Sequence, residues 1–383
     1  MTMRRLLTPA VALLALSAPA SARAAPPPLD RIAAQAMAQT GAQGIAIAMV
    51  EPGHLVAQGA WGRRNGAGDP LTTETVMYGA SLTKAVFAML VIELARVGRV
   101  DLDAPIARML PRPLPEYADP DERYAPWPDL AGDPRWSRIT PRHVLTHSTG
   151  FANFSWLNPD QKLTIHFDPG TRYGYSGDGL MLLQFGLERG IGIDVGKEVQ
   201  RRLFDRNGLT RSGLQWRADF ARNLADGWTA DGQIEPHDQR ERVRVAGSMD
   251  TTITDMARLW AGVLANRATL RAMARPGLAI TTASQFPTLQ PEIPRDRQFR
   301  NLRAGLGVVT FRGPQGPGFY KGGHNDSTGN TVVCLTRRPR CVIILSNDVR
   351  AEAAFPAIVR ATLGEAGVPW AWEYGALPWT VQP

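Results

Sequence analysis

The chain has 383 residues, of which 44% are hydrophobic and 20% charged, and its formal net charge is +8 at pH 7. This composition excludes a disordered chain and allows one large or two smaller globular domains with a substantial core. The positive charge does not indicate nucleic-acid binding, because the basic cluster Arg337-Arg338-Pro339-Arg340 lies in a predicted turn without interleaved aromatic residues.

The N-terminal segment has the pattern of a secretory signal peptide. Arg4 and Arg5 precede an apolar stretch from Leu6 to Leu16, and small residues with Ala-x-Ala cleavage options follow. We predict a signal peptide over residues 1–24, cleaved after Ala24 or two residues earlier, and a periplasmic or secreted protein; export by the Sec or the twin-arginine route stays open. No later stretch reaches the roughly 18 apolar residues that span a bilayer, so no integral membrane segment is expected after cleavage.

The next elements in chain order are strands at both chain ends and helices between them. Strands are predicted over residues 44–50 and 54–61, joined by Pro52-Gly53, and over 304–311, 331–335 and 341–346. Helices are predicted from Ser81 to about residue 97 and over 141–147, 180–188, 197–204, 254–265 and 351–363. Two proline-rich stretches, 111–136 and 276–297, are predicted to be long loops.

This arrangement predicts an α+β fold. Strands from both chain ends form one mainly antiparallel sheet flanked by helices, because the C-terminal strands complete a sheet that the N-terminal hairpin begins. We expect a single catalytic domain over residues 29–383, with an inserted helical subdomain over roughly 100–240.

The two cysteines, Cys334 and Cys341, lie in a predicted hairpin. If its turn centres on Arg337 and Arg338, the cysteines face each other across the strands. In an oxidising compartment such a pair can form a disulfide, and the alternative is two free buried thiols. The six histidines are scattered without zinc-type spacing, so no metal site is predicted.

Ser81-Leu82-Thr83-Lys84 places a hydroxyl and an amine one helical turn apart, on the same helix face. Only four of the 43 basic residues are lysines, so lysine is expected where arginine cannot serve, as in a side chain that must lose its proton. A lysine amine can activate a serine if burial or nearby positive charge lowers its pKa from about 10.4. Ser81 is therefore the candidate nucleophile and Lys84 its candidate base, and this chemistry requires no cofactor.

Further motifs follow in order: Gly98-Arg99-Val100-Asp101-Leu102-Asp103, Leu145-Thr146-His147-Ser148-Thr149-Gly150, Tyr175-Ser176-Gly177 and Ala246-Gly247-Ser248-Met249. With the Ser81 motif they resemble the serine β-lactamase and penicillin-binding-protein-like family, and the nearest branch is the class C β-lactamase-related hydrolases. The resemblance covers about residues 29–350 and implies the β-lactamase/transpeptidase-like fold.

The resemblance also implies a mechanism. Ser81 forms an acyl-enzyme while Lys84 and Tyr175 move protons, and the oxyanion hole uses the Ser81 N–H and a second N–H from a strand. Tyr175 would then need a phenolic pKa lowered by a nearby lysine. His147 is expected to hold a turn through hydrogen bonds rather than to act in catalysis.

Two departures from the family pattern concern substrate binding. Gly177 stands where β-lactamases of this branch carry asparagine, so an amide that would hold a substrate's acylamino group is missing. The third motif, Lys-Thr-Gly or His-x-Gly, is ambiguous in the segment Tyr320 to Ser327, where either Lys321 or His324 could head it. The spacing to Gly329 favours His324, and Ser327 is a further candidate for substrate binding.

We expect an exported serine hydrolase that cleaves an ester or amide of a small-molecule or peptide substrate, including peptidoglycan-derived ones. The missing amide favours esterase or D-amino-acid peptidase activity over efficient β-lactam hydrolysis. One alternative is a slowly acylating or non-hydrolytic penicillin- or peptidoglycan-binding protein of the same fold. Another is an α/β-hydrolase with Ser176 as nucleophile, because Gly174 to Gly179 nearly spells Gly-x-Ser-x-Gly, although the second glycine comes one residue late.

Overall fold

The structure, a computed structural model, describes residues 27–118 and 121–375. The predicted signal peptide, residues 1–24, lies outside the described residues. In the described part of the chain, no helix is long and apolar enough to cross a membrane.

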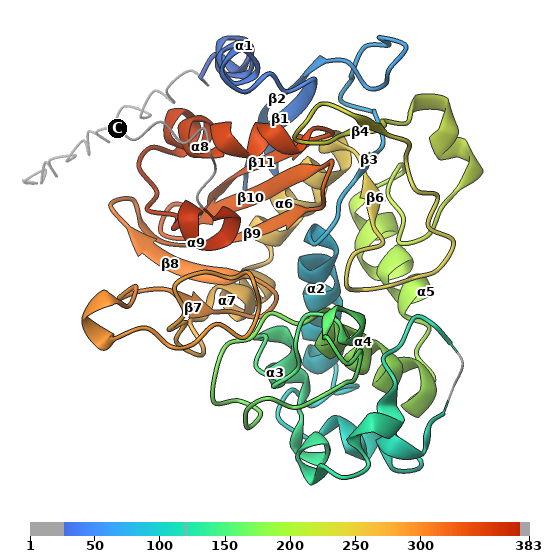
Figure 1. The fold of residues 1–383 in the computed structure, drawn as a ribbon. Coiled ribbons are helices and arrows are strands. Elements are labelled where there is room, and N and C mark those ends of the chain that lie inside the picture. The colour runs from blue at the N-terminus through green and yellow to red at the C-terminus, as the bar shows by residue number, and fades with distance from the viewer. Residues whose placement is uncertain (1–26, 119–120, 376–383) are drawn as a thin grey trace, which may run out of the picture.

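The centre of the fold is a seven-stranded sheet in the order β2-β1-β11-β10-β9-β8-β7, in which all neighbours are antiparallel (Figure 1). Its strands are β1 (Gly44–Glu51), β2 (His54–Gly62), β7 (Arg303–Ala304), β8 (Val309–Gly313), β9 (Gly316–His324), β10 (Gly329–Leu335) and β11 (Arg340–Ser346). β1 pairs with β11, with Ile47 opposite Ile344, so the two chain ends share one sheet, as predicted.

The helices are α1 (Leu29–Thr40), α2 (Leu82–Arg96), α3 (Pro141–Leu145), α4 (Gly177–Phe185), α5 (Val195–Val199), α6 (Ile253–Ala265), α7 (Arg267–Ala274), α8 (Phe355–Leu363) and α9 (Trp370–Tyr374). Two small ribbons pair β3 (Met77–Tyr78) with β6 (Asp250–Thr251) and β4 (Gly227–Trp228) with β5 (Ile234–Glu235). Wider π-helical turns extend α4 at Gly186–Gly190 and α5 at Gln200–Phe204.

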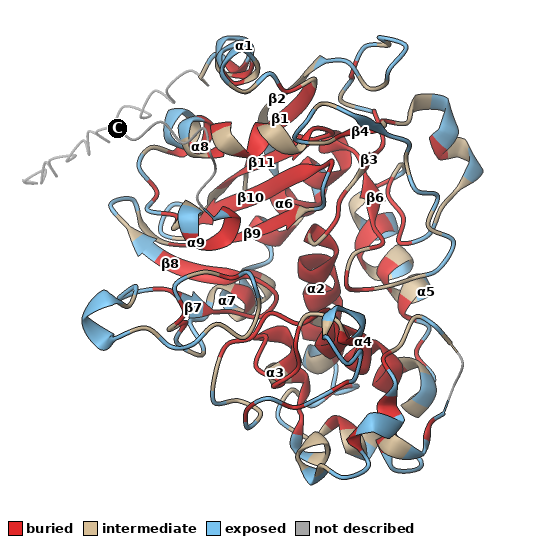
Figure 2. Cartoon of the chain, in the orientation of Figure 1, coloured by how far each residue is buried: buried red, intermediate tan, exposed pale blue. Residues whose placement is uncertain are grey.

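Both faces of the sheet are covered. Successive residues of a strand point to opposite faces, and β1 is buried along almost its whole length. Ala46 and Ala48 belong to the core formed with α2 and α6, whereas Ile45 and Ile47 belong to the core formed with α1 and α8. Figure 2 shows the resulting buried layer of strands with exposed residues confined to the rim.

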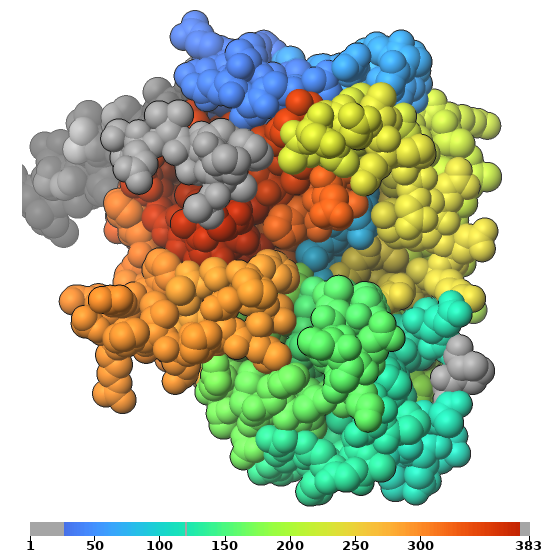
Figure 3. All heavy atoms as spheres, in the orientation of Figure 1, coloured from blue at the N-terminus to red at the C-terminus, as the bar shows by residue number. Residues whose placement is uncertain are grey.

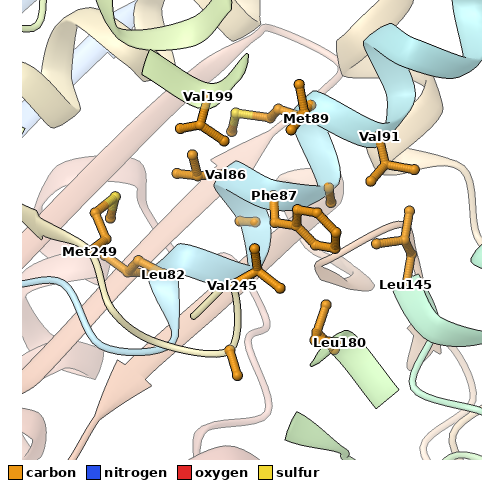
Figure 4. Close-up of a cluster of buried hydrophobic side chains, with 14 of the residues drawn as sticks. Leu82, Val86, Phe87, Met89, Val91, Leu145, Leu180, Val199, Val245 and Met249 are labelled. Carbon is orange, nitrogen blue, oxygen red and sulfur yellow. The ribbon is translucent and has the colours of Figure 1, made fainter. Parts of the chain in front are cut away.

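Helix α2 lies at the centre of the helical half of the molecule. Every residue from Leu82 to Ile92 is buried, which matches its unbroken apolar sequence. Figure 4 shows Phe87 and its neighbours on α2 packed among side chains from α3, α4, α5 and the 245–249 segment. Helix α2, which begins directly after Ser81, is thus surrounded by the core, and the predicted helical insertion is present.

One predicted strand needs correction, and several elements were not predicted. The strand predicted over 304–311 is two short strands, β7 and β8, separated by a turn in which Gly307 has a φ of 73°. Strand β9 was not predicted from hydrophobic pattern, because glycines at 316, 318, 322 and 323 dilute that pattern. Helices α1, α7 and α9 were also missed.

The Gly307 turn packs directly on helix α2, and this predicts a large loss of stability if a side chain is introduced there. A Cβ on Gly307 would lie 2.3 Å from the Cβ of Ala88, whereas Gly98, with almost the same φ of 72°, has open space around it. We expect Gly98→Ala to cost about 1 kcal/mol for the left-handed backbone alone and Gly307→Ala about 3 kcal/mol, because the clash adds to that strain. Urea unfolding of both variants measures the difference; equal losses would contradict the packing argument.

Cys334 and Cys341 are directly opposite each other in the β10–β11 ladder and form a disulfide, with both residues fully buried. The turn between the two strands contains Arg337, Arg338 and Pro339 of the basic cluster, and Arg340 is the first residue of β11.

Candidate active site

Ser81 is the N-cap residue of α2 and lines a cavity of about 1280 Å³. The preceding residue, Ala80, has a φ of 46°, a conformation that costs free energy in a non-glycine residue and is concentrated at functional sites. In Figure 3 the early, blue part of the chain is visible between the orange-to-red and yellow segments, in the hollow around this site.

Lys84 reaches back along α2 to the serine. Its Nζ donates to the Ser81 Oγ over 2.9 Å and also to the carbonyl oxygen of Ala246. The side chain is 2% exposed, and burial, followed by the positive charge of Lys321, holds the pKa of Lys84 well below its usual value. A neutral amine can accept the hydroxyl proton of Ser81, so the environment of Lys84 suits a general base.

Tyr175 lies directly before α4, and its hydroxyl donates to the Ser81 Oγ over 2.8 Å. The Nζ of Lys84 is 4.9 Å from the Tyr175 ring centroid, and the Nζ of Lys321 is 5.4 Å from it. Burial nevertheless raises the pKa of Tyr175, and the hydrogen bond with Ser81 opposes this only in part. The expectation of a lowered phenol pKa is therefore wrong: Tyr175 is a neutral hydrogen-bond donor here, and Lys84 is the better base.

His147 holds Tyr175 in place by stacking on its ring and by accepting a hydrogen bond from the backbone of the next residue, Ser176. Its ring stacks on Tyr175 with centroids 4.4 Å apart, and its Nδ1 accepts the N–H of Ser176 over 3.2 Å. Burial holds the pKa of His147 well below its usual value, so the ring is neutral. These contacts agree with the structural role expected from the sequence.

Strand β9 passes against the start of α2 and brings Lys321 into the site. A Cβ on Gly323 would lie 2.8 Å from the N of Leu82 and 2.9 Å from the carbonyl oxygen of Gly79, so only glycine permits this approach. Lys321 is 4% exposed and lines the same cavity as Ser81 and Lys84. Burial lowers the pKa of Lys321, although the charge of Glu373 opposes the shift.

His324, the last residue of β9, lines the cavity as well, but its Nδ1 lies 3.0 Å from a carboxylate oxygen of Glu352. Burial lowers its pKa, yet the hydrogen bond and charge of Glu352 outweigh that effect and raise the pKa overall. Ser327, in the turn after β9, is buried beneath Gly227 and does not line this cavity in the described structure.

Gly177 is covered rather than open to substrate. A Cβ on Gly177 would lie 2.2 Å from the Phe154 ring, and its N–H donates to the Asn153 Oδ1 over 3.0 Å. Asn153 and Phe154 line the cavity and were not predicted as site residues. Nothing in the spacing of the known motifs identifies them, because they come from the loop after Gly150.

Glu373 of α9 is another site residue that the sequence did not reveal. It is 4% exposed, lines the cavity, and its Oε1 would lie 2.3 Å from a Cβ on Gly322. Its charge raises the pKa of both Lys84 and Lys321. A glycine at 322, where the family motif has threonine, leaves the space that this carboxylate occupies.

The Ser176 alternative fails on geometry. Ser176 is fully buried, and its Oγ accepts the N–H of Gly179 as the N-cap of α4. The sheet is antiparallel, unlike the parallel sheet of an α/β-hydrolase. No group of three or more His, Cys, Asp or Glu side chains in the described ranges is arranged to hold a metal ion.

A serine in contact with a buried lysine and a tyrosine, at the start of a buried helix beside an antiparallel sheet, is the arrangement of a β-lactamase-related serine hydrolase. Residues 29–364 match the Beta-lactamase family, so the chain belongs to this family, with the class C β-lactamase and penicillin-binding-protein fold. Esterase EstB of Burkholderia gladioli is 31% identical over 132 residues, which cover 34% of this chain and 29% of the esterase.

Solved structures agree on the fold. A penicillin-binding-protein homologue from Pyrococcus abyssi, described as octameric, superposes with a TM-score of 0.68 at 18% identity, covering 88% of this chain and 77% of that one. The D-alanine carboxypeptidase AmpC from Burkholderia cenocepacia gives a TM-score of 0.66 at 17% identity, covering 88% and 97%. At these identities the likeness concerns the fold alone.

Proposed function

We propose that the protein is an exported hydrolase that cleaves an ester or amide through an acyl-enzyme on Ser81, with esterase or D-amino-acid peptidase activity favoured over efficient β-lactam hydrolysis. The observation that carries the proposal is the convergence of Lys84 Nζ and Tyr175 Oη on the Ser81 Oγ, at 2.9 and 2.8 Å. The similarity to an esterase and the fold of a D-alanine carboxypeptidase support the two favoured reactions. The N-terminal sequence pattern supports export to the periplasm or medium.

In the proposed reaction Lys84 accepts the hydroxyl proton of Ser81 as Oγ attacks the substrate carbonyl. The N–H of Ser81, which has no hydrogen-bond partner among the described residues, and an N–H of β9 stabilise the oxyanion. The leaving group departs with a proton passed from Lys84 through Tyr175, and water then releases the acyl group as a carboxylic acid. Lys321, rather than His324, heads the third motif in this scheme, because its ammonium shares the buried cluster with Lys84 and Tyr175.

β-Lactam hydrolysis is disfavoured because the Phe154 ring stands over Gly177, where an amide would hold an acylamino group. An alternative is a slowly acylating binding protein of the same fold, which would trap an acyl group on Ser81 without turnover.

Intact-mass spectrometry after exposure to a fluorophosphonate and, separately, to a penicillin tests the proposal. We expect a stable fluorophosphonate adduct on the peptide containing Ser81 and little or no penicillin adduct, together with multiple turnovers of a 4-nitrophenyl ester. A persistent penicillin adduct without ester turnover would favour the binding protein, and rapid penicillin hydrolysis would contradict the preference for other substrates.

A further inference from the structure

One wall of the catalytic cavity joins a cation to an aromatic platform that the proposed acyl transfer does not use. The rings of Phe154 and Trp156 stack with centroids 4.1 Å apart and an interplanar angle of 11°. The guanidinium carbon of Arg244 lies 5.8 Å from the Phe154 centroid and 5.3 Å from the Trp156 centroid. All three residues line the cavity that contains Ser81, and Trp156 is 49% exposed.

The guanidinium of Arg244 forms no ion pair with an acidic side chain among the residues that the structure describes. Within residues 27–118 and 121–375 its side chain makes no hydrogen bond, and it lies over the two aromatic rings. Asp178, whose charge acts most strongly on Arg244, is fully buried, and its carboxylate accepts the N–H of Ser155 over 2.6 Å. Burial lowers the pKa of Arg244, but arginine starts so high that it stays charged.

The neighbouring arginines of the same loop differ from Arg244 in this respect. Arg240 lies 3.5 Å from Asp238 and 3.7 Å from Asp250, and Arg242 lies 3.8 Å from Glu122. Partial burial removes water from the Arg244 guanidinium, which costs solvation free energy. A bound anion would offset that cost by supplying charge-assisted hydrogen bonds. Unlike Arg240 and Arg242, Arg244 can therefore bind the anionic group of a substrate without breaking an ion pair.

The platform also lies close to the reaction centre. The charge of Arg244 is among those that lower the pKa of Lys84. The Phe154 ring fills the space at Gly177, 2.2 Å from where a Cβ would stand. Where the family motif would place an asparagine, this chain has Gly177, and the space beside it is occupied by the ring of Phe154.

We propose that Arg244, Phe154 and Trp156 form a subsite for an acyl group that carries a carboxylate, bound by Arg244, on an apolar or aromatic body that packs against the two rings. A guanidinium binds a carboxylate through two parallel, charge-assisted hydrogen bonds. Cation–π contacts with the Phe154 and Trp156 rings fix the orientation of the Arg244 guanidinium. This inference rests on the proposed function and names its substrate class: esters or amides of carboxylated, apolar acids.

The test compares two esters with one leaving group: the 4-nitrophenyl ester of 4-carboxyphenylacetic acid and its neutral counterpart with the distal carboxylate capped as a methyl ester. We expect wild type to prefer the carboxylated ester in kcat/KM. Arg244→Gln should lower kcat/KM for that ester by about 10- to 100-fold, mainly through KM, and change the neutral ester less than about 3-fold. Arg242→Gln, which removes an exposed charge from the same cavity rim, should change neither by more than about 3-fold.

A binding measurement separates this inference from the proposed function. Calorimetry with the Ser81→Ala protein and the N-methyl amides of the same two acids reports the subsite without turnover. Binding of the carboxylated amide that depends on Arg244 supports the subsite even if neither ester is hydrolysed, in which case only the proposed reaction fails. Turnover of both esters with no charge preference, or equal losses for both esters in Arg244→Gln, overturns the subsite and leaves the hydrolase intact.

Discussion

Ser81→Ala is expected to reduce kcat for a 4-nitrophenyl ester by at least about 10⁴-fold, because loss of the nucleophile removes the covalent route and leaves only binding and oxyanion stabilisation. The fluorophosphonate adduct should disappear with it. The substitution removes no capping hydrogen bond, but it takes one acceptor from the buried Lys84 and Tyr175 side chains, so the free energy of unfolding should fall by no more than about 1–3 kcal/mol.

Ser176→Ala is the matched control. Ser176 is the N-cap residue of α4 and is fully buried, so it does not line the cavity that contains Ser81. Its substitution should cost about 1 kcal/mol of stability from the lost cap yet keep the adduct on Ser81 and most of the activity. Loss of labelling in Ser176→Ala with retention in Ser81→Ala would overturn the assignment of the nucleophile.

The part of the site that could be predicted from sequence is the part fixed by short-range geometry or by a motif. Ser81 and Lys84 are one helical turn apart, so their contact follows once the helix is inferred. Tyr175 was predicted by its motif, but its pKa was not, because burial is a property of the folded core. The sheet could be predicted because the sequence shows strand patterns near both chain ends and helical patterns between them, so the terminal strands are expected to pair with each other.

The remaining site residues depend on long-range packing. The choice between Lys321 and His324 rests on how β9 passes α2, and the glycines that allow this approach also weaken the strand pattern. Glu373 arrives from the C-terminal helix, beyond the residues 29–364 that match the family. Trp156 and Arg244 meet only because two loops fold against each other, and no local spacing encodes that contact.

Substitution of the base is the second large effect that we expect. Lys84→Arg keeps a long basic side chain, but its guanidinium stays charged and cannot accept a proton, so the substitution should lower kcat/KM by about 10³-fold, within the range found for loss of a general base. Ester turnover measures this loss, and circular dichroism establishes that the variant is folded. Retention of more than about a tenth of the activity would contradict the assignment of Lys84 as the base.

The pH profile then tests why Lys84 can act as a base. The free amine is the active form, so kcat/KM should rise with pH through the pKa of Lys84, which burial and the charge of Lys321 hold below its usual value. Glu373 raises that pKa, so Glu373→Gln should move the rising limb to lower pH. Lys321→Met removes a charge that lowers it and should move the limb to higher pH. Opposite shifts from two neighbours in one cavity require an electrostatic origin, because a general loss of packing would lower the rate without moving the limb in either direction.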